Sequence, residues 1–193
     1  MRKTLPFLAA ALLAAVLVIG LTQAGGGSDS PSGSAEPFDL RAARERLQGS
    51  PPPLAELHAQ ANQLLGGGRD AFEERLRELR GHPVVINKWA SWCGPCRAEF
   101  PIFQNVATDR GREVAFLGVD GRDKRPAATS FLDRYPIPFP SYEDPDEDIA
   151  RWLDVPANYP ATVFVNADGE PVFTHQGGYR SEADLTADIE RHL

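Results

Sequence analysis

Two cysteines directly follow a short apolar run, and this junction constrains the fold more than any other feature of the 193-residue chain. The run PVVINKWA, residues 83–90, is rich in β-branched residues and too short for a typical helix, so it predicts a buried strand. The stretch SWCGPC that follows contains Cys93 and Cys96, the only cysteines in the sequence. We expect a central strand that delivers both cysteines at its carboxyl end, where the active sites of α/β sheets lie.

Helical and strand patterns alternate after the cysteines. This alternation predicts an α/β fold, with helices flanking a central mixed sheet. The turn ADGE, residues 167–170, joins the last two strand-like runs, so we expect an antiparallel hairpin at one edge of the sheet. The expected helices are residues 95–109, 125–135, 146–153 and 181–193, and the expected strands are residues 113–120, 161–166 and 171–176.

Charge-rich helical patterns precede the central strand. The apolar residues that recur there at three- and four-residue spacing are Leu54, Leu57, Ala61, Leu64 and Leu65. They predict one amphipathic helical stripe, and because no heptad repeat persists for three turns, we expect this layer to pack on the domain rather than to form a coiled coil. We therefore divide this part of the chain into a helical extension, residues 38–69, and a main domain, residues 70–193.

The first 23 residues are expected to be a membrane anchor or a cleaved signal peptide. Two basic residues precede an uncharged apolar run that ends near Leu21, and as a helix of about 26 Å it would just span a bilayer core. The basic residues favour an N-terminus inside the cell and a domain outside it. Cleavage near Ala24 is the alternative. Residues 24–37, rich in glycine, serine and proline, predict a flexible linker.

The composition and the motifs exclude or disfavour several functions. A formal net charge of −7 argues against a nucleic-acid surface, which needs a basic patch. A zinc site needs about four ligands, and the four histidines are scattered without a second cysteine pair. A purely structural disulfide is possible in an exported chain, but so short a loop gains little stability. The P-x-x-x-T-x-x-C pattern of peroxidases is absent, because Ile86 and Ala90 occupy its proline and threonine positions.

A C-x-x-C sequence that opens a helix favours thiol chemistry. Both sulfurs then lie on the first turn, close enough to bridge. Cys93, at the helix cap, is near the positive end of the helix dipole, which favours its thiolate and makes it the nucleophile. Cys96 lies one turn further in and suits the resolving role. Pro95 has no N–H to lose in the first turn.

The string WASWCGPC followed by RAEFP resembles the thioredoxin superfamily, and in particular the exported TlpA/ResA/DsbE-like thiol-disulfide oxidoreductases. The resemblance covers roughly residues 70–193. It implies a thioredoxin-like fold with a helix-plus-strand insertion around residues 126–155. It also implies that Pro160, which precedes the strand ATVFV, is a cis proline facing the disulfide, and that Pro101 kinks the helix.

The resemblance also assigns roles around the cysteines. Asn87 occupies the position where cytoplasmic thioredoxins have a buried aspartate, and an amide cannot take up a proton. Glu99, three residues after the second cysteine, is expected to titrate late and to accept the proton of Cys96. The residues expected to contact substrate are Trp92, Gly94, Pro95 and Tyr159.

These features together predict a tethered, extracytoplasmic enzyme that reduces protein disulfides, with a possible role in cytochrome c maturation. It would need no cofactor or metal besides the Cys93–Cys96 disulfide, and a membrane thiol donor would recharge it because its compartment is oxidising. Two alternatives stay open. One is an oxidant that forms disulfides, and the other is a redox-inert module that binds a client or a metallochaperone.

Overall fold

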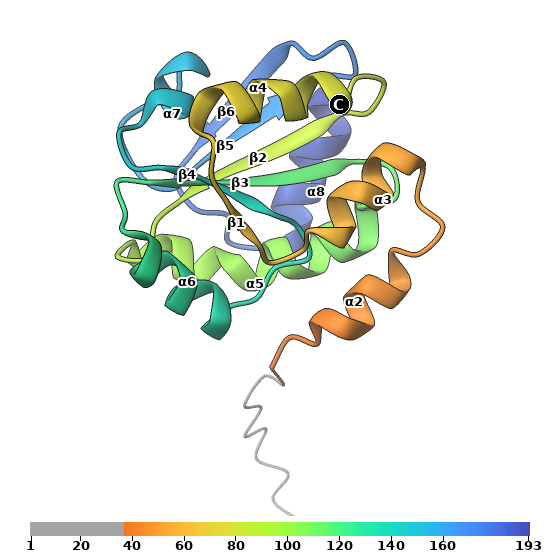
Figure 1. Cartoon of the computed structure of the whole chain (residues 1–193). Coiled ribbons are helices and arrows are strands. Elements are labelled where there is room, and N and C mark those ends of the chain that lie inside the picture. The colour runs from red at the N-terminus through yellow and green to blue at the C-terminus, as the bar shows by residue number, and fades with distance from the viewer. Residues whose placement is uncertain (1–36) are drawn as a thin grey trace, which may run out of the picture. The chain divides into compact units, whose positions relative to one another are not determined.

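The structure is a computed structural model that describes residues 37–193 (Figure 1). The predicted anchor or signal peptide, residues 1–23, and all of the predicted linker except Pro37 lie outside the described residues. Within the part that is described, no helix is long and apolar enough to cross a membrane.

A six-stranded mixed sheet forms the centre of the fold, with the strand order β1-β4-β3-β2-β5-β6. Strands β1, β4, β3 and β2 run parallel to one another, whereas β5 is antiparallel to both β2 and β6. The strands are β1 (Leu64–Leu65), β2 (Val84–Trp89), β3 (Ala115–Gly121), β4 (Ser141–Asp144), β5 (Ala161–Val165) and β6 (Pro171–Gln176). The predicted central strand is confirmed as β2, and the predicted hairpin is confirmed as β5 and β6 at one edge.

Helices cover both faces of the sheet (Figure 1). The described helices are α2 (Leu40–Arg46), α3 (Pro52–Ala59), α4 (Gly68–Glu78), α5 (Gly94–Arg110), α6 (Arg125–Arg134), α7 (Asp148–Trp152) and α8 (Glu182–His192). Apolar residues of α5, α6 and α8 pack with Val85 and Trp89 of β2 on one face. Those of α3, α4 and α7 pack with Val84 and Ile86 on the other. The period-two alternation of a strand thus divides β2 between two cores.

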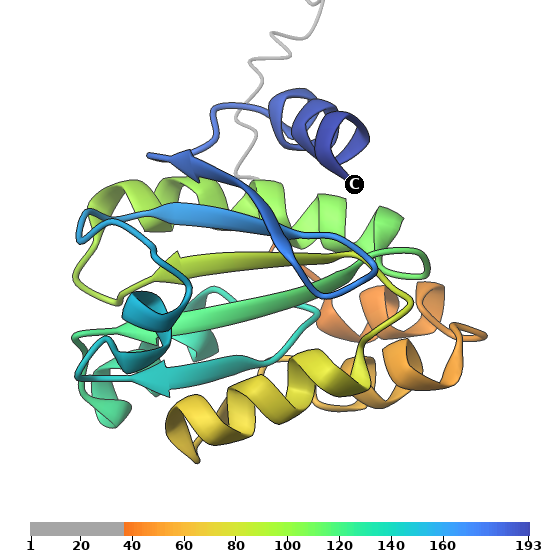
Figure 2. The ribbon, with the colours of Figure 1, turned by 90° about the horizontal axis from the view of Figure 1, so that it is seen from above.

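The hairpin and the closing helix α8 lie together at one side of the sheet (Figure 2). The imidazole of His192 near the end of α8 stacks on the ring of Phe173 in β6, with ring centroids 3.9 Å apart. The hydroxyl oxygen of Ser181 accepts the backbone N–H of Asp184 and caps the start of α8. Residues 38–193 form one compact unit, which includes the N-terminal helices.

The helical prediction for Leu64 and Leu65 is wrong, because these residues form β1 and pair with Ser141 and Tyr142 of β4. The helix before them ends at Ala59, and Asn62 takes a left-handed backbone conformation with a φ of 64°. The Asn62 backbone N–H donates to the carbonyl of Phe139, and its side-chain oxygen accepts the N–H of Ile137. Asn62 therefore attaches this segment to the chain before β4, which favours strand pairing over another helical turn.

The expected insertion is confirmed as α6 followed by β4, with α7 after them. The local sequence pattern does not predict the strand β4, because it indicates a loop between the two helices. The acidic stretch EDPDED, residues 143–148, contains the end of β4, a turn and the start of α7. Asp144 is buried, and its two carboxylate oxygens accept the backbone N–H groups of Ile149 and Ala150.

Candidate active site

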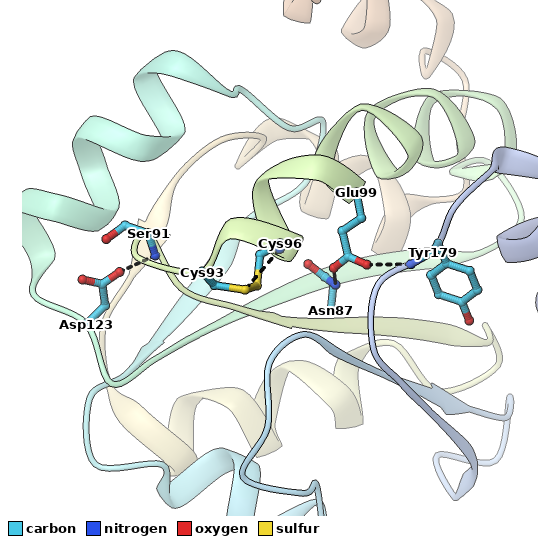
Figure 3. Close-up of a disulfide and its surroundings, with 7 residues drawn as sticks. All are labelled: Asn87, Ser91, Cys93, Cys96, Glu99, Asp123 and Tyr179. Carbon is cyan, nitrogen blue, oxygen red and sulfur yellow. Dashed lines mark hydrogen bonds between the residues drawn. A yellow bond between two sulfur atoms is a disulfide. The ribbon is translucent and has the colours of Figure 1, made fainter.

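The two cysteines form a disulfide at the N-terminus of α5 (Figure 3). Cys93 is the residue before the first helical turn, and its Sγ accepts the backbone N–H of Cys96 at 3.1 Å. Both cysteines are buried, Cys96 completely and Cys93 with 3% of its surface exposed. Gly94 and Pro95, which lie between them, are exposed. The disulfide is therefore almost fully buried but lies next to an exposed backbone turn.

Glu99 lies one turn further along α5 and is fully buried (Figure 3). Its Oε1 accepts the side-chain N–H of Asn87 at 2.8 Å, and its Oε2 accepts the backbone N–H of Tyr179 at 3.1 Å. Burial raises the pKa of the Glu99 carboxyl to about 7, although the two hydrogen bonds act in the opposite direction. The carboxyl is therefore poised to take up or release a proton near neutral pH.

Pro160 closes the site from the side of β5. The Tyr159–Pro160 peptide bond is cis, as the family resemblance implied. The carbonyl of Pro160 accepts the backbone N–H of Gly177, which draws the segment after β6 toward the same place. A Cβ on Gly178 would lie 3.6 Å from Oε2 of Glu99 and 3.7 Å from both Cγ of Pro160 and the carbonyl oxygen of Pro95. Three chain segments thus meet around Gly178.

Two aromatic side chains flank the disulfide on the surface. Trp92 is 56% exposed, and its indole N–H donates to the backbone carbonyl of Arg122 at 3.1 Å. Its ring meets that of Tyr159 edge-on, with centroids 5.0 Å apart. A Cβ on Gly121 would lie only 2.1 Å from the Tyr159 hydroxyl, so the ring can occupy this place only because residue 121 is glycine. The structure therefore brings all eight residues predicted for the site into one region.

A buried ion pair that the sequence did not predict contacts Tyr159. The Lys88 ammonium lies 2.8 Å from a carboxylate oxygen of Glu147, and only 2% of the lysine side chain is exposed. The same ammonium donates to the carbonyl of Pro156 at 2.9 Å and lies 4.1 Å from the centroid of the Tyr159 ring. Glu147 also accepts the Tyr159 hydroxyl at 2.8 Å and pairs with Arg122.

These contacts decide the charge of Glu147. Its burial alone would raise the pKa of the carboxyl, but the hydrogen bonds from Lys88 and Tyr159, together with the charges of Lys88 and Arg122, outweigh burial and lower that pKa. The Glu147 carboxyl therefore stays ionised at neutral pH. The only signal in the sequence was a lysine inside a run that otherwise predicts a buried strand.

A carboxylate also holds the loop that leads into the disulfide (Figure 3). Oδ2 of Asp123 accepts the backbone N–H of Ser91 at 2.6 Å. Nearby, Asp120 is buried at the end of β3, and burial raises the pKa of its carboxyl to about 8, with the charge of Asp123 and a hydrogen bond to it adding to the effect. Asp120 therefore keeps its proton at neutral pH. The stretch VDGRDK after a predicted strand was the signal that could have pointed to these residues.

Tyr179 is a further residue of the site that the sequence did not predict. It supplies a backbone N–H to Glu99, and its hydroxyl donates to Asp188 of α8 at 2.9 Å. Its ring stacks on His175 of β6 at 4.1 Å. The edge hairpin and α8 therefore fix the position of one of the two donors to Glu99. Among residues 37–193, no group of three histidine, cysteine or acidic side chains is placed to hold a metal ion.

Comparison with known proteins identifies the family of this chain. The profile of the AhpC/TSA family matches residues 59–171. The thiol-disulfide oxidoreductase ResA of Oceanobacillus iheyensis is 30% identical over 104 residues, which are 52% of this chain and 53% of the relative. The soluble secreted antigen MPT53 of Mycobacterium tuberculosis is 36% identical over 97 residues, 50% of this chain and 55% of the relative. The chain thus matches only about half the length of these curated relatives.

A solved structure gives the same answer for the fold. The crystal structure of a secreted Mycobacterium tuberculosis disulfide oxidoreductase, described as homologous to Escherichia coli DsbE, is 31% identical and superposes with a TM-score of 0.54. The match covers 60% of this chain and 85% of that one. The mixed sheet flanked by helices confirms the thioredoxin-like fold that the WASWCGPC motif predicted. The chain belongs to the AhpC/TSA family.

Proposed function

We propose that this chain is an extracytoplasmic protein thiol-disulfide oxidoreductase that reduces the disulfides of other proteins. The observation that carries the proposal is the Cys93–Cys96 disulfide at a helix N-terminus, with buried Glu99 and cis-Pro160 beside it. The names of the relatives, the thiol-disulfide oxidoreductase ResA and a secreted disulfide oxidoreductase, support thiol-disulfide exchange, and the reducing direction is our proposal. In this proposal Trp92, Gly94, Pro95 and Tyr159 contact the substrate, as their exposed or half-exposed positions around the disulfide allow.

The first step is attack by Cys93 on a client disulfide. In the reduced enzyme the Cys93 thiolate is stabilised by the N-terminal end of α5 and by the N–H of Cys96, which already points at its sulfur. The thiolate bonds to one client sulfur, and the other client sulfur leaves as a thiolate that takes up a proton. Cys93 lies at the border of exposed Gly94, so it is the sulfur that a client can reach.

The second step resolves the mixed disulfide. Cys96 must lose its proton before it attacks Cys93, and Glu99, one helical turn away with a pKa of about 7, is the group placed to accept it. The Cys93–Cys96 bond then forms and the second client sulfur leaves. The client gains two electrons and becomes a dithiol, while the enzyme dithiol becomes the disulfide. A thiol donor outside this chain must return two electrons before the next turnover.

The N-terminal sequence and the names of relatives support an extracytoplasmic place of action. One relative is named a secreted antigen and one solved structure a secreted oxidoreductase. We propose that residues 1–23 anchor the chain in the membrane, with a membrane thiol donor as the source of electrons and haem-attachment thiols of apocytochrome c among its clients. Membrane fractionation tests the anchor: the protein should resist extraction by high salt, whereas soluble protein that begins near Gly25 would identify a cleaved signal.

Reduction of insulin by dithiothreitol tests the proposed reaction. The full-length wild-type chain in detergent should accelerate the reaction, and Cys93→Ala should be no better than buffer because it removes the nucleophile. The matched variant Cys96→Ser should also fail to turn over, but it should retain clients as mixed disulfides that mass spectrometry identifies in an envelope extract. A wild-type chain that neither reduces insulin nor traps a client through Cys96→Ser would leave the redox-inert binding module as the better description.

A further inference from the structure

Three exposed basic residues lie on the chain segments that border the disulfide of this acidic protein. We define the basic rim as Arg97, Lys124 and Arg180, three exposed residues on three different segments. Arg97 directly follows Cys96 on α5. Lys124 follows Asp123, whose carboxylate holds the backbone of Ser91.

Arg180 completes the basic rim from the other side. It follows Tyr179, whose backbone N–H donates to Glu99. Figure 3 shows Asp123 and Tyr179 at opposite ends of the row of side chains that contains the disulfide. Lys124 and Arg180 therefore belong to chain segments on two sides of the disulfide, and Arg97 lies on the first turns of α5, directly after Cys96.

The charges of the basic rim are available to a partner. Within residues 37–193, none of its three side chains forms an ion pair, whereas the neighbouring Arg122 pairs with Glu147. The only acidic residue in the segments 90–98, 121–124, 157–160 and 177–181 is Asp123. Its two oxygens already accept the backbone N–H groups of Ser91 and Lys124. These four segments thus carry more cationic than acidic side chains, although the whole chain carries a net charge of −7.

An apolar contact lies inside the basic rim. Trp92 is the most exposed large apolar side chain of the described residues, and its indole is fixed by the carbonyl of Arg122 and by the ring of Tyr159. A fixed, exposed indole offers contact area at low cost in conformational entropy. A partner that covers Trp92 while its sulfur reaches Cys93 brings its flanking residues to the basic rim.

We propose that the basic rim selects client proteins whose disulfide is flanked by acidic residues. The inference rests on the proposed disulfide exchange and adds the class of client. Attraction between the basic rim and an acidic client raises the rate of association, and repulsion lowers this rate for a basic client. Salt screens both interactions, so the difference between the two clients decreases as the salt concentration rises. The net negative charge of the rest of the chain strengthens the discrimination, because an acidic client is attracted only where the basic rim lies.

The test compares peptides that differ only beside their cysteines. Three synthetic peptides carry the same intramolecular disulfide, flanked by aspartates, lysines or serines. Reduced full-length protein is mixed with each one, and the second-order rate constant is followed by stopped-flow fluorescence. Each rate constant is divided by that of dithiothreitol with the same peptide, which removes the intrinsic reactivity of the disulfide. The expected ratio of aspartate to lysine peptide is about tenfold or more at about 0.01 M salt and approaches one near 1 M.

Charge reversal then assigns the effect to the basic rim. The triple variant Arg97→Glu, Lys124→Glu and Arg180→Glu should invert the ratio of aspartate to lysine peptide. Because both rate constants are measured on the same variant, their ratio does not depend on any change in the reactivity of the Cys93 thiolate. The separate single variants should each move the ratio in the same direction, which keeps the test valid if the triple variant fails to fold.

A matched control changes the net charge equally at the opposite end of the fold. The control variant carries Arg41→Glu on α2, Arg77→Glu near the end of α4, and Arg112→Glu between α5 and β3. The last two positions lie at the end of the sheet where the parallel strands begin. The helix α2 contacts the far end of α5 through the ion pair of Arg46 with Asp109. This control should keep the wild-type preference.

The outcomes separate this inference from the proposed function. If the serine peptide is reduced, the proposed reaction stands. An aspartate to lysine ratio that is independent of salt, or unchanged by reversal of the basic rim, then overturns the inference alone. If no peptide is reduced by the wild type, the proposed function fails, and the inference fails with it.

Discussion

At the scale of single residues, the site is organised around one buried carboxyl group. Glu99 is fully buried, yet its two hydrogen-bond donors, the Asn87 amide and the Tyr179 backbone, hold it in a single orientation. Asn87 stands where the resemblance expects an acid in cytoplasmic relatives, and here it donates a hydrogen bond to the acid that replaces it. In the proposed mechanism the proton acceptor therefore lies on the helix α5, and the strand β2 supplies a hydrogen-bond donor to it.

Glu99→Gln should slow disulfide exchange near pH 7 by about tenfold or more, because positioned general bases typically contribute a factor of about 10² to 10⁴. The variant keeps the size of the side chain and one of its two acceptor oxygens, but it cannot take up a proton. The pH–rate profile should therefore lose its inflection near pH 7, measured by stopped-flow with the serine peptide. Glu113→Gln, an exposed acid after α5, is the matched control and should leave the profile unchanged.

The same variant should change how stability depends on pH. The folded pKa of Glu99 is raised to about 7 from a usual value of 4.5, so between these values the unfolded chain is ionised while the folded chain holds the proton. Wild-type stability therefore falls as pH rises through this window, by about 1.4 kcal/mol per pH unit for one group. Glu99→Gln should fall less steeply in urea unfolding between pH 5 and 7. If the free energy of unfolding depends on pH equally steeply in wild type and variant, the pKa of Glu99 is not raised in the folded chain.

At the scale of elements, the ion pair of Lys88 and Glu147 joins three segments that are distant in sequence. Lys88 belongs to β2, Glu147 immediately precedes α7, and both contact Tyr159 in the loop before β5. Glu147 also has a φ of 57°, a left-handed conformation that is uncommon for a residue other than glycine. The pair therefore positions the cis-proline loop, and with it the half-exposed ring that meets Trp92.

Lys88→Met should destabilise the fold by about 3 to 5 kcal/mol, because removing one partner leaves a buried carboxylate with less compensation. The double variant Lys88→Met with Glu147→Gln should recover most of that loss, since it removes both charges. Urea unfolding of the single and double variants gives both numbers. A single variant as stable as wild type would mean that Arg122 alone compensates the charge of Glu147.

The sequence predicts an element or a contact when neighbouring residues determine it, and fails to predict it when residues distant in the sequence do. β2, α5 and the β5–β6 hairpin follow from short patterns of neighbouring residues, and the sequence predicted them correctly. β1 does not, because Asn62 and the pairing with β4 determine it from outside the segment. Glu147, the partner of Lys88, lies in a run of acidic residues, which is typical of an exposed segment. Tyr179 donates to Glu99 through its backbone N–H, a group that every residue except proline has, so the residue type gives no sign of this contact.

At the scale of the whole molecule, the direction of electron flow depends on how strongly the fold stabilises the Cys93 thiolate. The N-terminus of α5 and the N–H of Cys96 favour the thiolate, which makes the reduced form more stable and the disulfide more oxidising. Glu99 acts in the opposite direction, because a buried carboxylate on the same helix opposes a second negative charge nearby. The Gly94–Pro95 pair between the cysteines is the one found in reducing thioredoxins.

We therefore predict a reduction potential at the reducing end, near the value of about −270 mV for thioredoxin rather than about −120 mV for DsbA. Equilibration of the purified full-length chain with glutathione and with dithiothreitol measures it, with the thiol and disulfide forms counted after alkylation. Only dithiothreitol should reduce the Cys93–Cys96 bond completely, and Glu99→Gln should shift the potential toward oxidising values because it removes the opposing charge. Complete reduction by glutathione at ordinary ratios would instead identify an oxidant, which needs an electron acceptor in place of a membrane thiol donor.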